Sequence, residues 1–155
     1  MNGSKKNKKI VMVSGGFDPV HIGHVRMFQE AKELGDKLVV VLNNDNWFKV
    51  KGKPLFMPEE ERREIIQALG CVDEVVVTSH SKNTKDISVC EELKKIRPHI
   101  FANGGDRFAE NIPEFQLCRE LGIEMVFNVG HGGKVRSSSL LLKNYYKKHG
   151  KKLKK

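Results

Sequence analysis

The sequence predicts an α/β protein built as a doubly wound sandwich, in which a five-stranded parallel sheet lies between two layers of helices. Short apolar runs alternate along the chain with amphipathic segments of helical length, the order that builds βαβ units and a parallel sheet. The 155 residues contain no linker or internal repeat that divides them, so one domain is expected. Crossovers between parallel strands are right-handed, and the helices are therefore expected on both faces of the sheet.

Five runs rich in β-branched residues have the length and composition of buried strands. The predicted strands cover residues 10–14, 38–42, 75–77, 100–102 and 123–127. Gly15 and Gly16 end the first strand, and Asn103, Gly104 and Gly105 end the fourth. Ligands of doubly wound sheets bind outside the carboxyl ends of the strands. We therefore expect the chemistry of the protein near these two glycine pairs.

Between the strands, apolar residues recur at helical spacing and are bounded by helix start and stop signals. The predicted helices cover residues 23–34, 58–69, 86–96, 113–121 and 137 onward. Gly35 gives the first helix a C-terminal stop, and Pro58 with three following glutamates gives the second an acidic first turn. The run Asn43-Asn44-Asp45 is predicted as a turn. Trp47 and Phe48 are expected to pack at the sheet edge, with stacking on a ligand as the alternative.

The formal net charge of +9 comes from the two ends of the chain. Residues 1–9 hold four lysines and residues 143–155 hold seven, without any acid, and the other 17 basic residues are matched by 19 acidic ones. We therefore interpret residues 1–9 and 149–155 as basic, solvated tails around a domain at residues 10–148. A nucleic-acid binder is the less favoured interpretation, and it would show a steep salt dependence of DNA affinity.

The cysteines and the apolar runs bear on the compartment in which the protein works. Cys71, Cys90 and Cys118 are odd in number and lack metal-like spacing, so a disulfide framework is not expected. No apolar run approaches the length of a membrane span, and the basic start leads into only a short apolar run at residues 10–13. The sequence therefore predicts a cytoplasmic protein without a membrane partner.

The segment that joins the first strand to the first helix reads Gly15-Gly16-Phe17-Asp18-Pro19-Val20-His21-Ile22-Gly23-His24. Glycines let backbone N–H groups approach an anion closely, and the start of a helix adds partial positive charge. His21 and His24 can both donate hydrogen bonds to one phosphate, and Gly23 keeps the space between them clear. The alternatives are a zinc pair, which would need further Cys or His ligands nearby, and a purely structural helix cap.

This segment resembles the signature G-x-F-D-x-x-H-x-G-H of the HxGH nucleotidyltransferase superfamily, the cytidylyltransferase-like proteins. The resemblance covers about residues 9–148, and it is greatest to glycerol-3-phosphate cytidylyltransferase and to the nucleotidyltransferase domain that makes ADP-heptose. It implies a Rossmann-like fold and an enzyme that moves a nucleoside monophosphate from an NTP to a phosphorylated small molecule, with release of pyrophosphate. A non-catalytic nucleotide-binding module on the same scaffold is the alternative.

The resemblance also implies roles for individual residues. It makes His21, His24, Lys51 and Arg62 catalytic, whereas Arg63 is expected to face solvent. The nucleotide-binding residues that it implies are Gly15, Gly16, Phe17, Asp18, Gly104, Asp106, Ser137, Ser138 and Ser139. Mg²⁺ is the expected cofactor because it neutralises the triphosphate while keeping most of its waters, and Asp18 is its one candidate protein contact. Relatives often form dimers, so the resemblance allows a homodimer.

The base and the acceptor depend on a departure from the family pattern. Cytidylyltransferases carry R-T-x-G-I-S-T-T, and an expected arginine is replaced here by Gly132, for which Lys134 and Arg136 are the candidate substitutes. CTP is narrowly favoured, so that CMP would be transferred to glycerol 3-phosphate or a sugar phosphate. An adenylyltransferase of the heptose-phosphate or phosphopantetheine type, which uses ATP, is the alternative. Residues 78–86 and 107–116 are expected to flank the acceptor.

Overall fold

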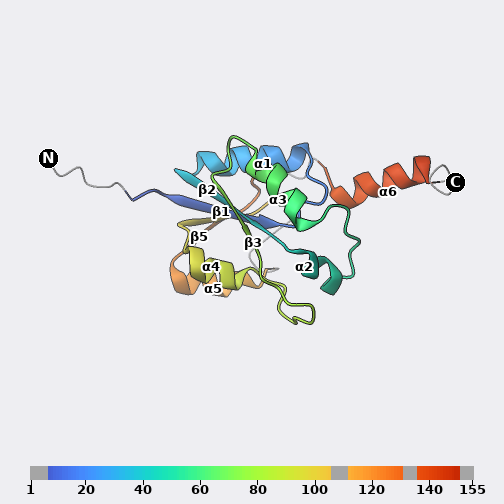
Figure 1. Ribbon diagram of the computed structural model, residues 1–155. Helices are drawn as coiled ribbons and strands as arrows, with labels where there is room; N and C mark the ends of the chain where they lie inside the picture. The colour runs from blue at the N-terminus through green and yellow to red at the C-terminus, as the bar shows by residue number, and fades with distance from the viewer. Residues whose placement is uncertain (1–6, 106–111, 131–135, 151–155) are drawn as a thin grey trace.

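The computed structural model describes residues 7–105, 112–130 and 136–150. Its centre is a parallel sheet of five strands in the order β3-β2-β1-β4-β5 (Figure 1). The strands are β1 (Ile10–Gly15), β2 (Lys37–Leu42), β3 (Glu74–Val77), β4 (Ile100–Ala102) and β5 (Glu124–Val126). The predicted sheet is thus confirmed, and most of its strand ends lie within one residue of the predicted ones.

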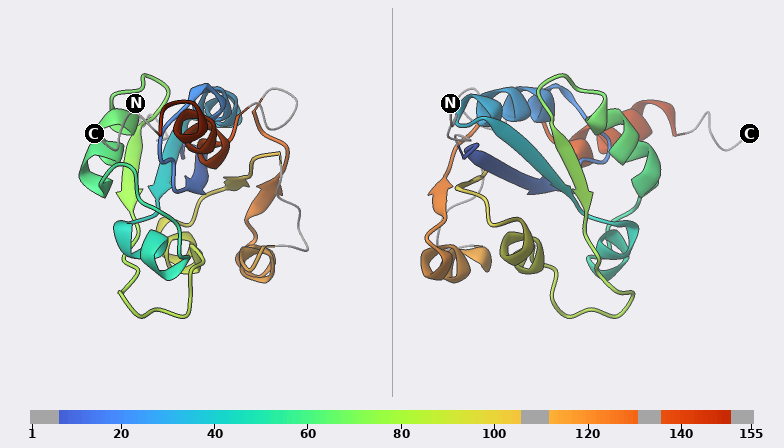
Figure 2. Two further views of the ribbon diagram at one scale, coloured as in Figure 1. Left: turned by 90° about the vertical axis from the view of Figure 1, so that its right-hand side faces the viewer. Right: turned by 60° about the vertical axis from the view of Figure 1, so that its left-hand side comes forward.

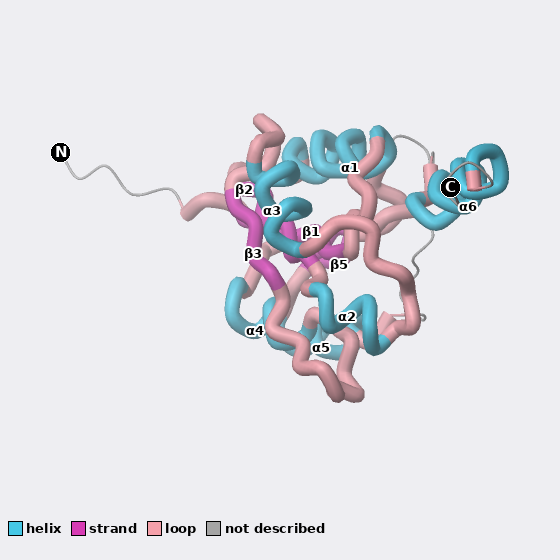
Figure 3. Tube along the Cα trace, turned by 45° about the vertical axis from the view of Figure 1, so that its right-hand side comes forward, coloured by secondary structure: helices cyan, strands magenta, loops and turns pink. Residues whose placement is uncertain are grey.

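The helices cover both faces of the sheet, as a doubly wound fold requires. They are α1 (Ile22–Glu33), α2 (Asp45–Val50), α3 (Glu59–Gln67), α4 (Cys90–Ile96), α5 (Glu114–Leu121) and α6 (Ser138–His149). Helices α1 and α3 lie over one face, and α4 and α5 lie over the other, with α2 beyond the end of the sheet (Figures 1 and 2). Helix α6 extends away from the layers, and none of its residues is buried (Figure 3).

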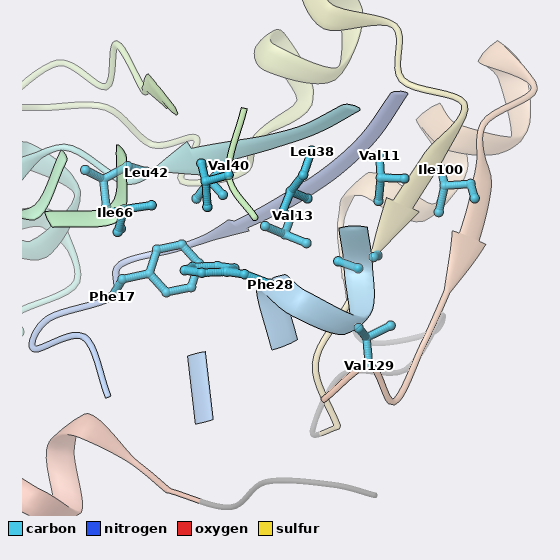
Figure 4. Close-up of a cluster of buried hydrophobic side chains, with 13 residues drawn as sticks. Val11, Val13, Phe17, Phe28, Leu38, Val40, Leu42, Ile66, Ile100 and Val129 are labelled. Atoms are coloured by element: carbon cyan, nitrogen blue, oxygen red, sulfur yellow. The ribbon is translucent and has the colours of Figure 1, made fainter. Parts of the chain in front are cut away.

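Each face of the sheet has its own hydrophobic core, because successive residues of a strand point to opposite sides. Val11 and Val13 of β1 point toward α1, where they join a cluster that includes Phe28 (Figure 4). Met12, between them, belongs to a second cluster with Leu93 of α4. Burial of both faces is why the strands read as continuous apolar runs in the sequence.

The strand order reverses beside β1, since β2 and β3 lie on one side of it and β4 and β5 on the other. This switch point places the glycines after β1 and those after β4 at the same edge of the sheet, as the sequence predicts. Within the described ranges, no helix is long and apolar enough to cross a membrane. Cys71, Cys90 and Cys118 are free thiols.

Two local predictions were wrong. The run after β2 is not a simple turn, because the Asn44 side chain accepts a hydrogen bond from the Trp47 N–H at 3.0 Å and thereby caps the unpredicted helix α2. Helix α4 begins at Cys90 rather than at Asp86, because the Asp86 carboxyl accepts a hydrogen bond from the Ser88 N–H at 2.9 Å and forms a local turn instead. The outermost residues of the two predicted tails, 1–6 and 151–155, lie outside the described residues.

Candidate active site

A cavity of about 490 Å³ opens at the carboxyl edge of the sheet, at the switch point. Most of the predicted phosphate-binding residues line it, namely Gly15, Gly16, Phe17, His21, His24, Lys51 and Gly104. Further lining residues include Met27, Asn43, Trp47, Lys53, Ile87, Val89, Gly105, Ile112, Glu114, Val129, Gly130 and Arg136. The chain therefore brings segments from both halves of the fold to one site.

The two histidines form a stacked pair at the start of α1, with ring centroids 3.7 Å apart and 22° between the ring planes. The Gly23 N–H donates to Nδ1 of His21 at 3.1 Å, and the His21 N–H donates to Nδ1 of His24 at 3.3 Å. A ring nitrogen that accepts a hydrogen bond does not carry the proton, so these bonds place the ring proton on Nε2 in both histidines. The pair thus caps α1 and also lines the cavity. The helix-cap interpretation and the phosphate-binding interpretation of the sequence are therefore compatible.

The glycines of the first loop are required by the aromatic rings around them. A Cβ atom on Gly15 would lie 2.8 Å from Cζ of Phe17, and one on Gly16 would lie 2.7 Å from Cζ of Phe48. At Gly23 a Cβ would lie 2.9 Å from Cε1 of His21, which agrees with the prediction that this glycine keeps space beside the histidines. Close packing therefore adds to anion access as a reason for glycine here.

Helix α2 and the residues that follow it bring a tryptophan and two lysines to the cavity wall. Nζ of Lys51 lies 5.1 Å from the centroid of the Trp47 ring, and Nζ of Lys53 lies 5.7 Å from it. The Trp47 indole N–H donates to the Ile87 carbonyl at 3.1 Å, which fixes the ring. Trp47 thus lines the cavity rather than only packing at the sheet edge, whereas Phe48 is buried. The sequence analysis gave a ligand-contacting Trp47 only as the alternative, and Lys53 was not among the predicted site residues.

Arg62 lies behind the cavity and is fully buried. Its guanidinium donates to the carbonyls of Gly16 at 2.7 Å, Asn43 at 2.8 Å and Met57 at 2.9 Å. It also forms a salt bridge with Asp45, at 2.7 Å. The structure therefore places this predicted catalytic residue among backbone carbonyls instead of on the cavity wall. Arg63 is exposed, as predicted.

Asp18 is also engaged within the protein. Its carboxyl oxygens accept hydrogen bonds from the N–H groups of Phe56 at 2.6 Å and Met57 at 2.8 Å, and the residue is 8% exposed. These bonds hold the loop between α2 and α3 against the first loop. Among the described residues, no group of three or more His, Cys, Asp and Glu side chains has an arrangement suited to holding a metal ion.

The serines at the start of α6 do not line the cavity of the histidine pair. Ser137 caps the helix by accepting from the Leu140 N–H at 3.4 Å, and the Ser138 hydroxyl donates to the Pro19 carbonyl at 2.9 Å. Ser138 and Ser139 line a second, mainly apolar cavity of about 870 Å³ between α6 and residues 53–56. Gly16, Phe17, Trp47 and Lys53 line both cavities. The predicted residue Asp106 and the segment 131–135, with Gly132 and Lys134, lie outside the described residues.

The segment that leads into α4 is fixed by its own hydrogen bonds. The Ser88 hydroxyl and backbone N–H hold the pKa of the Asp86 carboxyl below its ordinary value. His80 reaches the same segment, with Nε2 2.9 Å from the Ser88 carbonyl oxygen. These contacts set the position of Ile87 and Val89, which line the cavity on the side of α4 and α5. Residues 78–86, which the sequence predicts to flank the acceptor, precede Ile87 and do not line the cavity, whereas Ile112 and Glu114 of the predicted segment 107–116 do. The role of both segments toward an acceptor stays a prediction.

The fold and the cavity define a doubly wound α/β protein with a cavity at the switch point of its sheet, the position at which such folds bind ligands. The model of the Cytidylyltransferase-like family matches residues 12–137, and the chain belongs to this family. It is 40% identical to an FAD synthase of Ferroglobus placidus over 116 residues, which are 75% of this chain and 72% of that protein. It is also 37% identical over 126 residues to the Bifunctional protein HldE of Pelobacter propionicus, and this match covers 78% of the chain and 24% of HldE.

A solved structure agrees with these matches. The lipopolysaccharide core biosynthesis protein of Thermoplasma volcanium superposes with a TM-score of 0.65 at 26% identity, covering 80% of this chain and 98% of that one. Family membership and these relatives confirm the Rossmann-like fold and the superfamily that the first loop predicts. The protein is a nucleotidyltransferase.

Proposed function

We propose that the protein is an adenylyltransferase that transfers AMP from ATP to FMN, forming FAD and releasing pyrophosphate. The histidine pair at the start of α1, which lines one cavity with Lys51 and Lys53, is the observation on which this proposal depends. Such a set of donors and positive charges suits a polyphosphate. The similarity to an FAD synthase over 75% of the chain supports ATP as the nucleotide and FMN as the acceptor. It favours the ATP alternative over the CTP that the sequence narrowly favoured.

In this reaction a phosphate oxygen of FMN attacks the α-phosphorus of ATP. A new P–O bond forms as the bond to the β-phosphate oxygen breaks, and pyrophosphate leaves with the electron pair of that bond. Because the attacking group is already an anion, the chain has to position two polyanions and offset their charge. The Nε2–H groups of His21 and His24 would donate to oxygens of the reacting phosphates, and Lys51 and Lys53 would offset the charge on the acceptor side.

Mg²⁺ would enter the site with ATP, since a triphosphate binds this ion through its own oxygens while the ion keeps several waters. The ion would neutralise part of the triphosphate charge. Asp18 offers it little, because both carboxyl oxygens already accept backbone hydrogen bonds. The chain's own contribution would therefore come from the N–H donors and lysines around the phosphates. The implied role of Ser137, Ser138 and Ser139 at the far phosphates stays a prediction.

A second candidate is adenylyl transfer to a heptose phosphate. The similarity to HldE and to a lipopolysaccharide core biosynthesis protein favours this reaction. It needs the same nucleotide and the same phosphate chemistry, so only the acceptor distinguishes it from FAD synthesis.

The test is a matrix of ATP, CTP, GTP and UTP against FMN, glycerol 3-phosphate, heptose 1-phosphate and phosphopantetheine, with Mg²⁺ present. Pyrophosphate release reports turnover, and mass spectrometry identifies the product. We expect ATP with FMN to give the highest kcat/KM and a product with the mass of FAD. A higher kcat/KM with heptose 1-phosphate would establish the second candidate. Preference for CTP with glycerol 3-phosphate would overturn the proposal, and nucleotide binding without pyrophosphate release would identify a non-catalytic module.

A further inference from the structure

Glu114 is a buried carboxyl group on the wall of the active-site cavity. It is the first residue of α5 and is 2% exposed. One of its oxygens, Oε1, accepts a hydrogen bond from the Val89 N–H at 3.0 Å. The other, Oε2, has no hydrogen-bond partner among the residues that the structure describes. One oxygen of this carboxyl group therefore holds the start of α4, and the other accepts no hydrogen bond from the described part of the chain.

Asn43 shows the same feature on the same cavity. This residue follows β2 and is 5% exposed, and its backbone is fixed by bonds to Gly15 and Arg62. Its side-chain oxygen Oδ1 likewise has no hydrogen-bond partner within the described segments. In the ranges that the structure describes, the buried side-chain oxygens and nitrogens without a hydrogen-bond partner are Oδ1 of Asn43 and Oε2 of Glu114. Both residues line the cavity of the histidine pair.

A buried polar atom without a partner is uncommon in native proteins, because it loses its hydrogen bonds to water and gains none in return. Two such atoms on the wall of one cavity indicate that the bound ligand supplies the missing donors. Both atoms are oxygens, so the complementary groups on the ligand are O–H or N–H donors.

The position of Glu114 assigns it to the acceptor rather than to the triphosphate. Its neighbours on the cavity wall, Ile87, Val89 and Ile112, come from segments at the α4 and α5 face of the sheet. The histidine pair lies at the start of α1, which covers the opposite face (Figures 1 and 2). A triphosphate held at the histidines would thus leave the α4 and α5 side of the cavity to the attacking substrate. The sequence also predicts an acceptor-flanking segment at residues 107–116.

We propose that Glu114, together with Asn43, recognises hydroxyl groups on the acceptor. The substrate class is then a phosphomonoester that carries hydroxyl groups close to its phosphate, such as a polyol or sugar phosphate. This inference rests on the proposed function, and it fits FMN because a hydroxylated ribityl chain joins the phosphate of FMN to its ring. Glu114 acts here as a specificity-determining residue that binds the acceptor and takes no part in the bond exchange.

The test compares Glu114→Gln with the wild type in steady-state kinetics. Glutamine keeps the size of the side chain and an oxygen for the Val89 N–H, but it presents an NH₂ group where Oε2 accepts. We expect the KM for FMN to rise about 10- to 100-fold, the effect of a lost hydrogen bond that leaves a buried group unpaired. The KM for ATP should stay unchanged. A flavin phosphate whose ribityl chain is replaced by an alkyl chain should have the same KM in both proteins.

Glu92→Gln is the matched control. Glu92 is a buried glutamate, 5% exposed, on the neighbouring helix α4, and it does not line the cavity. We expect this variant to keep the wild-type KM for both substrates. Thermal unfolding of all three proteins shows whether the two substitutions affect the fold equally.

The outcomes separate this inference from the proposed function. If the wild type forms FAD and Glu114→Gln leaves the KM for FMN unchanged, or raises that for ATP instead, the inference is overturned and the function stands. If the wild type instead uses another hydroxylated phosphomonoester, FMN is the wrong acceptor. The role of Glu114 is then decided by whether Glu114→Gln raises the KM for that acceptor and leaves the KM for ATP unchanged. Preference for an acceptor without hydroxyl groups overturns both.

Discussion

The polar residues around the first loop form two regions that differ in what they contact. In the phosphate corner, defined here as His21, His24 and Lys51, the side chains line the active-site cavity. In the buried support, defined as Asp18, Asp45 and Arg62, the side chains bond to the backbone and to each other behind it. The members of the two regions are interspersed along the chain, and each region contains a cationic side chain, so neither sequence position nor positive charge separates them.

Under the proposed function, the difference separates residues that position the loops from residues that contact the substrates. In the buried support, the guanidinium group of Arg62 donates to the carbonyls that follow β1 and β2 and to a carbonyl of the loop before α3. In the phosphate corner, backbone N–H groups engage Nδ1 of each histidine and thereby orient Nε2. Substitutions in the support should therefore reduce stability first, whereas substitutions in the corner should reduce turnover first.

The largest effect is expected for Arg62→Met. This change leaves three carbonyls without their donor and breaks the salt bridge to Asp45, whose side chain is 25% exposed. We expect the free energy of unfolding to fall by about 3–5 kcal/mol, mainly because the carbonyls lose their partner in the interior. Urea unfolding measures the loss. Arg63→Met is the control, because Arg63 is exposed and its removal should change little. Arg62→Lys, which can keep part of the bonding, should be intermediate. A stable Arg62→Met protein with a hundredfold lower kcat would instead support the catalytic role that the family resemblance implies.

The next effect concerns His21→Ala and His24→Ala. We expect kcat to fall about 10²- to 10³-fold in each variant, which is the effect of removing one donor to a developing charge, or about 3–4 kcal/mol. Loss of the helix cap should lower the free energy of unfolding by only about 1 kcal/mol, so both proteins should stay folded. Pyrophosphate release and circular dichroism measure the two quantities. His99→Ala is the control, because His99 is an exposed histidine whose Nδ1 accepts from the Ile10 N–H, away from the cavity. Normal turnover in both active-site variants would refute the role of the pair.

The strands and most helices could be predicted because their signals are local. The apolar runs of β1 and β2, the period of Val25, Phe28 and Ala31 in α1, and the stops at Gly15 and Gly35 all act within a few residues. Helix α2 was missed because Asn44 is as typical of a turn as of a helix cap, and only the neighbouring chain decides between them.

The candidate site could be predicted where a residue's role depends on its own loop, as for His21 and His24. The roles of Arg62 and Glu114 depend on distant segments. Whether an arginine points into a cavity or toward carbonyls 19 and 46 residues away is decided by tertiary packing. A glutamate after Pro113 reads as an ordinary acidic residue at a helix start, and its unpartnered oxygen is visible only once the fold is known.

The smallest effect is expected for Asp18→Asn, and it distinguishes a support residue from a metal contact. Asparagine keeps one acceptor for the N–H groups of Phe56 and Met57 but turns an NH₂ group toward the other, so the free energy of unfolding should fall by about 1–2 kcal/mol. Because both oxygens of Asp18 are already bonded to the backbone, the Mg²⁺ concentration that gives half-maximal turnover should not change. Urea unfolding and a Mg²⁺ titration of pyrophosphate release measure the two quantities. A large rise in the required Mg²⁺ concentration, with stability unaffected, would show that Asp18 contacts the metal ion during the reaction and is not a support residue.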